Sequence, residues 1–205
     1  MKKKIKVFAM FCAVAAAGLM VGCGSQGEPV AKISAINGQV SARMAKAPDF
    51  AAIEAEQQLM SGDAIKTGDE SSVDMELISD KSQIRLNSNT FLEIRNFSEK
   101  ELKQMSGIAI YKITPQNRQL KIQTPQGMAT VLGTTLRIDV SDEETVVSVE
   151  KGKVGFSKKA GHEVLIEGGM KYSSKSSLDQ AEPIDPFELE KAFHGDNLKP
   201  IINPR

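Results

Sequence analysis

The chain has 205 residues, with 26 basic and 26 acidic side chains, and charged residues make up 25% of it. Hydrophobic residues reach 40%, which is the composition of a folded globular protein rather than of a disordered one. The N-terminal lysines Lys2, Lys3, Lys4 and Lys6 leave the remainder net acidic, and an acidic domain lacks the basic face that nucleic-acid binding requires.

The N-terminus has the layout of an export signal. A basic start, MKKKIK, is followed by an apolar run from Val7 to Val21 and then by Gly22 and Cys23. A membrane-spanning helix needs about 20 apolar residues, and this run is shorter. Residues 1–22 therefore predict a cleaved signal peptide rather than a transmembrane anchor.

The stretch Leu19–Cys23 resembles the bacterial lipobox, with Met20 in place of the usual leucine. This resemblance implies that Cys23 is lipidated, with palmitate or a similar acyl chain, and begins the mature protein, so that 23–30 is a lipidated linker. Several acyl chains hold a protein stably on a membrane. Gly24 in place of Asp implies the outer membrane if the organism has two membranes. An ordinary secretory signal with an incidental cysteine is the alternative.

The body of the chain, residues 31–175, alternates apolar and polar side chains with a period of two. Val73, Met75 and Leu77, for example, alternate with Asp74 and Glu76. This alternation is typical of half-buried strands, and turn signals such as Gly168-Gly169 separate the runs. We predict one all-β domain, an antiparallel β-sandwich or roll of short strands, with a β-solenoid-like stack as the alternative.

Helical segments are few. Residues 50–59 (FAAIEAEQQL) and 98–105 have helical propensity and predict short helices between strands. The last 30 residues, 176–205, read as a polar tail in which 186–193 forms a short amphipathic helix with Asp185 as its N-cap. We expect this helix to dock on its own domain; docking on a partner is the alternative.

Two sequence blocks carry glycine and threonine motifs. The first is GDAIKTG at 62–68, and the second is IQTPQGMATVLGTTLRIDV at 122–140. With these blocks, residues 33–172 resemble the FecR domain family, although Lys81 stands where the family usually has glycine. We expect the motif residues to specify turns rather than chemistry, because glycine permits turns and proline ends ladders. They are Gly62, Asp63, Thr67, Gly68, Thr124, Pro125, Gly133 and Thr134.

Residues for catalysis or metal binding do not cluster in the sequence. The two cysteines, Cys12 and Cys23, precede the domain, and the two histidines, His162 and His194, lie far apart. No nucleophile elbow or phosphate-binding loop is present. Paired carboxylates for glycoside hydrolysis stay open as an alternative, although a chain without Trp offers few sugar platforms. We therefore predict no enzyme activity, no catalytic residue, no cofactor and no metal site.

Two functions from different classes fit these features. The first is a lipid-anchored cell-envelope protein whose β-domain is a non-catalytic binding or scaffold module for an envelope protein or polymer. The second, implied by the FecR resemblance, is a periplasmic sensor component of a cell-surface signalling system that controls a sigma factor. Met1–Lys6 is too short to be the cytoplasmic segment of the family's namesake, so we expect a role confined to the periplasm. Neighbouring sigma-factor and transporter genes would favour the second function.

Overall fold

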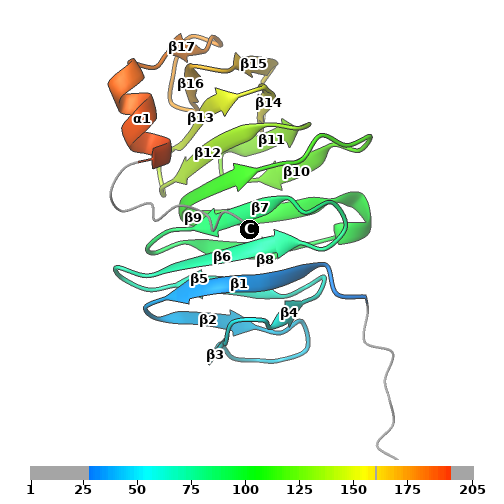
Figure 1. Cartoon of the computed structure of the whole chain (residues 1–205). Coiled ribbons are helices and arrows are strands. Elements are labelled where there is room, and N and C mark those ends of the chain that lie inside the picture. The colour runs from blue at the N-terminus through cyan, green and yellow to red at the C-terminus, as the bar shows by residue number, and fades with distance from the viewer. Residues whose placement is uncertain (1–27, 160, 195–205) are drawn as a thin grey trace, which may run out of the picture.

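The computed structural model describes residues 28–159 and 161–194, which form a stack of short strands with one helix near one end (Figure 1). The all-β class with a short C-terminal helix is confirmed, and the strands do not close into a barrel. The strands are β1 (Ala31–Asn37), β2 (Val40–Arg43), β3 (Ala51–Ala52), β4 (Gln58–Leu59), β5 (Ala64–Thr67), β6 (Ser72–Leu77), β7 (Gln83–Leu86), β8 (Phe91–Ile94), β9 (Glu101–Lys112), β10 (Leu120–Gln123), β11 (Gly127–Val131), β12 (Thr135–Val140), β13 (Thr145–Lys151), β14 (Lys153–Lys158), β15 (Glu163–Glu167), β16 (Met170–Ser173) and β17 (Glu182–Pro183). The helical elements are η1 (Phe97–Glu99) and α1 (Pro186–His194).

The strands form two sheets, A and B, that pack face to face, as in the predicted sandwich. Sheet A runs in the order β4, β1, β6, β7, β9, β12, β13, β16, β17. Sheet B runs in the order β3, β2, β5, β8, β9, β10, β11, β14, β15. Among the described strands every pairing is antiparallel except that of β9 with β10. The predicted antiparallel architecture is therefore present.

Strand β9 belongs to both sheets. Its first half, 101–106, pairs with β8 in sheet B, and its second half, 107–112, pairs with β7 and β12 in sheet A. The strand changes sheet at Gly107, whose φ of +81° lies in the left-handed region that glycine tolerates. One residue thus joins the two faces of the sandwich.

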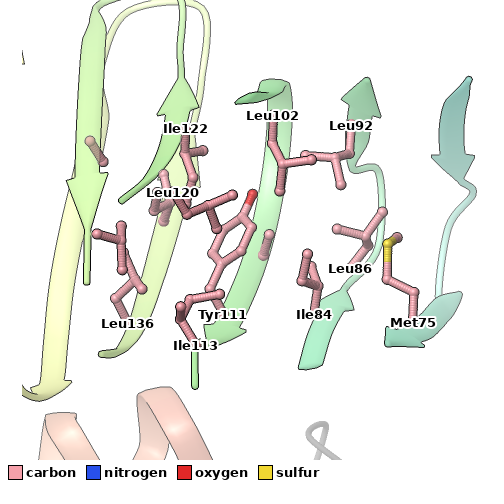
Figure 2. Packing of buried hydrophobic residues seen from close by; sticks show 14 of the residues in the cluster. Met75, Ile84, Leu86, Leu92, Leu102, Tyr111, Ile113, Leu120, Ile122 and Leu136 are labelled. Atoms are coloured by element: carbon pink, nitrogen blue, oxygen red, sulfur yellow. The ribbon is translucent and has the colours of Figure 1, made fainter. Parts of the chain in front are cut away.

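The core lies between the two sheets and collects the apolar half of each alternating strand. Because successive side chains point to opposite faces of a sheet, a period-two pattern places every second residue in this layer. Figure 2 shows Tyr111 at its centre, with its ring between side chains from neighbouring strands. Fully burying each large apolar side chain contributes about 1.5–3 kcal/mol. The other labelled residues of this core cluster are Met75, Ile84, Leu86, Leu92, Leu102, Ile113, Leu120, Ile122 and Leu136.

The two helices expected between strands are wrong. Residues 50–59 contain the short strands β3 and β4 with a turn between them, and most of 98–105 belongs to β9, which follows the 3₁₀ turn η1. Leu59 is fully buried and lies opposite Ala31, so pairing with β1 and burial outweigh the helical propensity of this segment. Helical propensity has little effect where a segment can pair with the edge of a sheet and bury an apolar side chain in the core.

The C-terminal helix α1 docks on the outer face of sheet A, near β12 and β13 (Figure 1). Asp185 caps it, because its Oδ1 accepts a hydrogen bond from the Phe187 N–H at 2.9 Å. Arg137 on β12 donates from Nη1 to the Ala192 carbonyl oxygen at 3.0 Å, and Phe193 is buried. The helix is therefore held on its own domain by the Arg137 hydrogen bond and by burial of Phe193.

Candidate interaction surface

Asp63 is almost fully buried and its carboxylate holds two loops together. Its Oδ1 accepts a hydrogen bond from the Ala45 N–H and its Oδ2 accepts one from the Met60 N–H, both at 2.8 Å. The preceding Gly62 has a φ of +94°, and a Cβ there would lie 2.7 Å from the Cβ of Ala45. Both oxygens of the carboxylate thus bind backbone groups.

Thr67 and Gly68 connect three loops at the end of β5. The Thr67 hydroxyl donates to the Asn87 carbonyl oxygen at 2.5 Å and accepts from the Thr90 N–H at 2.9 Å. The Gly68 N–H donates to the Gln39 carbonyl oxygen at 2.9 Å. These contacts join loops far apart in sequence and leave the Thr67 hydroxyl buried among backbone groups.

Thr124 and Pro125 form the turn between β10 and β11. The Thr124 Oγ1 accepts a hydrogen bond from the Gly127 N–H at 3.2 Å, and the Thr145 hydroxyl lies 2.9 Å from it. Proline has no N–H to leave unpaired in this turn. The turn is therefore closed by a buried pair of threonine hydroxyls.

Gly133 and Thr134 link β11 to β12. Gly133 has a φ of +66°, and a Cβ there would lie 2.9 Å from the Cα of Pro115. The Thr134 hydroxyl donates to the Lys153 carbonyl oxygen at 2.9 Å. The link needs glycine for its backbone conformation and for the close approach of Pro115.

The eight motif residues lie in separate turns and do not meet at one site. Their polar side chains bind backbone groups, and Thr124 also contacts the hydroxyl of Thr145. Lys81, at the position where glycine is usual, has a φ of +61°, so the β6–β7 turn keeps a left-handed residue without glycine. This geometry supports a structural role for the motif and places any recognition surface elsewhere.

The described residues contain no cluster of metal-ligating side chains, and one buried and one partly buried group have shifted pKa values. In residues 28–159 and 161–194, no three His, Cys, Asp or Glu side chains gather where they could hold a metal ion. Burial raises the pKa of Tyr111, whose hydroxyl lies in the core. Burial opposes ionisation of Asp80, but hydrogen bonds from Ser82 and Lys100 outweigh it and lower the pKa of that carboxyl. Both shifts belong to structural contacts.

Cys23 lies outside the described residues, so its expected lipidation is not addressed by the structure. Within the described part of the chain, no helix is both long and apolar enough to span a bilayer.

A group of aromatic and basic side chains lies on the outer face of sheet B, and we call Arg43, Phe50, Lys66 and Phe91 the Phe50 patch. Arg43, Lys66 and Phe91 come from β2, β5 and β8, and Lys66 lies directly opposite Phe91. Phe50 immediately precedes the edge strand β3. β2 and β3 lie at the end of the stack opposite α1, and β5 and β8 follow them toward its middle (Figure 1).

Both cations of the Phe50 patch make cation–π contacts with the Phe50 ring. The Arg43 Cζ and the Lys66 Nζ lie 5.5 and 5.7 Å from the centroid of the Phe50 ring. Phe50 meets Phe91 edge to face, with centroids 5.9 Å apart and an interplanar angle of 76°. Phe50 is 37% exposed, a high value for a large apolar side chain. The patch thus combines an exposed ring with two cations.

The sequence patterns did not identify the Phe50 patch. Phe50 begins a segment that the sequence predicts to be helical, and Phe91 reads as one residue of an ordinary strand. The only sequence signal is that Arg43, Lys66 and Phe91 occupy the polar half of the alternation in their strands. Three strands and a loop have to assemble before these residues meet.

The family model described as FecR protein matches residues 63–155. Two crystal structures, each described as a candidate anti-sigma factor from Parabacteroides distasonis, resemble the chain with TM-scores of 0.52 and 0.51 at 17% sequence identity. The similarity covers 60% of this chain and 60% of each of those chains. At this identity the likeness establishes the fold. No curated protein matches the sequence.

Proposed function

The chain carries a FecR domain, and from this premise we propose that it is the extracytoplasmic sensor component of a cell-surface signalling system that controls a sigma factor. The family match over residues 63–155 is the observation that carries the proposal. The description of its structural neighbours as candidate anti-sigma factors supports it. In this proposal the domain binds a partner and catalyses no reaction.

The structure supports a binding role through the distribution of its polar groups. The motif side chains, such as Asp63 and Thr67, are buried and bind backbone groups, so they build the scaffold. We therefore expect the exposed outer faces of the sheets to bind the partner. Sheet A carries α1 on part of its outer face, whereas the Phe50 patch of sheet B is uncovered by any described helix. A sensor of this design recognises partners with its surface side chains.

The proposed role is tested by deleting the gene in the source bacterium and measuring all transcripts. We expect genes that share one class of promoter to change together, by about fivefold or more, and to return to normal when the full chain is supplied. As a matched pair, Gly169→Val should restore the transcripts, whereas Gly107→Val, which we expect to destabilise the fold, should not. An unchanged transcript profile would overturn the proposal and leave the scaffold function.

We further propose that Cys23 anchors the protein to a membrane through lipid, because Leu19–Cys23 resembles the lipobox. With Cys23→Ser, the protein is expected to move from the membrane fraction to the soluble fraction after a salt wash, since its acyl chains are lost. Cell fractionation and immunoblotting measure the shift, with Ser25→Ala as the matched control. Retention of the Cys23→Ser protein at the wild-type level would contradict lipid anchoring.

A further inference from the structure

We propose that the Phe50 patch docks an acidic, extended segment of a partner protein. The inference rests on the proposed function and deepens it, because it names the chemistry of the partner that the sensor recognises. The patch has two unpaired cations on an aromatic ring, and it lies beside an open edge of sheet B.

The charge of the patch is unbalanced. No acidic side chain of the described residues lies within salt-bridge distance of Arg43 or Lys66. Other basic residues of this part of the chain, such as Lys121, are unpaired as well, but Arg43 and Lys66 both lie over one ring, that of Phe50. Glu93, further along the same face on β8, pairs with Arg95 at 3.3 Å. The patch therefore presents two unpaired cations on one ring, where a single external anion can contact both.

The aromatic rings position these cations for an incoming ligand. Cation–π contact with Phe50 restrains the side chains of Arg43 and Lys66, and it uses none of their N–H donors. Restraint before binding lowers the entropic cost of forming the complex. An acidic side chain can accept hydrogen bonds from these donors while its neighbours contact the exposed ring of Phe50.

The edge of sheet B favours a peptide as the source of the anions. β3 pairs only with β2 among the described strands, and Ala51 and Ala52 are exposed and small. The Ile53 N–H donates to the Val40 carbonyl oxygen, so by alternation the backbone groups of Ala52 point away from β2. An extended segment can add a strand at this edge. Its side chains on the outer face then lie next to Phe50, over whose ring Arg43 and Lys66 extend from β2 and β5.

The inference is tested with the purified full-length chain and fluorescently labelled peptides of about ten residues, long enough to form an added strand. One peptide alternates glutamate with valine, and its counterpart alternates lysine with valine. We expect the acidic peptide alone to raise the anisotropy signal, with an affinity that falls as sodium chloride is added. Vesicles of equal parts phosphatidylglycerol and phosphatidylcholine are the competing source of anions and are expected not to displace the peptide.

Charge reversal locates the binding surface. Lys66→Glu and Arg43→Glu should each weaken binding of the acidic peptide by about tenfold or more, and Phe50→Ala should weaken it as well. Lys121→Glu is the matched control, because Lys121 is an exposed lysine on the same sheet face, three strands further along at β10. We expect this variant to bind like the wild type. Lys66→Gln provides a milder change if the reversed charge impairs folding.

Three outcomes would overturn the inference: no binding of the acidic peptide, equal weakening by Lys121→Glu and Lys66→Glu, or displacement of the peptide by the anionic vesicles. The transcript experiment separates this failure from failure of the proposed function. Regulated transcripts without peptide binding would remove the patch assignment and leave the sensor role. Peptide binding without regulated transcripts would remove the sensor role and leave the docking surface.

Discussion

Replacing Gly107 by valine is expected to destabilise the domain by about 4 kcal/mol or more. A Cβ at this position would lie 2.4 Å from the Cα of Thr90 and 2.6 Å from the carbonyl oxygen of Asn89. Both contacts involve backbone atoms, which cannot rotate away as the end of a side chain can. The φ of +81° adds strain for a β-branched residue. Because β9 passes between the sheets at Gly107, relief of the collision would separate them.

Gly169 is the matched control for this prediction, because its φ is also +81° and a Cβ there would meet nothing within 4 Å. Gly169→Val should therefore cost only the backbone strain, roughly 1–2 kcal/mol. Urea denaturation of the two variants measures the difference in the free energy of unfolding. Equal losses of stability would show that the backbone near Thr90 yields at little cost, and the predicted role of close packing at Gly107 would be wrong.

Replacing Gln104 by alanine is expected to destabilise the domain by about 3–5 kcal/mol. Gln104 is fully buried, and its Nε2 donates to the carbonyl oxygens of Gly107 at 2.9 Å and Ile138 at 3.1 Å. Its Oε1 accepts a hydrogen bond from the Tyr111 hydroxyl at 3.0 Å. The truncation leaves these buried polar groups without that partner and opens a cavity beside the crossover of β9.

Tyr111→Phe is the matched control for Gln104→Ala, because it removes one hydrogen bond of the same network and keeps the ring. It should cost about 1–2 kcal/mol, since only the Gln104 Oε1 loses a partner. Denaturant unfolding of both single variants and the double variant gives the coupling between them. A loss below about 1 kcal/mol for Gln104→Ala would mean that water or a shifted side chain satisfies the carbonyl groups.

The sequence determined the fold class and many of the turns because both depend on local order along the chain. Alternation such as that of Val73, Met75 and Leu77 places one face of each strand in the core wherever the strand pairs. Asp185 and Pro186 start the C-terminal helix by capping and by a preset φ, which are also local effects. The family resemblance likewise rests on short blocks, and the family match spans residues 63–155.

The tertiary structure decided which strand joins which sheet and where surface residues meet. Residues 50–59 have the composition of a helix, but pairing with β1 and β2 and burial of Leu59 make them strands. The crossing of β9 at Gly107 depends on strands on both sides of it, and the Phe50 patch gathers side chains from β2, β5 and β8 with the loop before β3. A period-two pattern predicts which residues of a strand face the core. It does not predict which strand pairs with which, because that depends on backbone pairing and burial between segments far apart in the sequence.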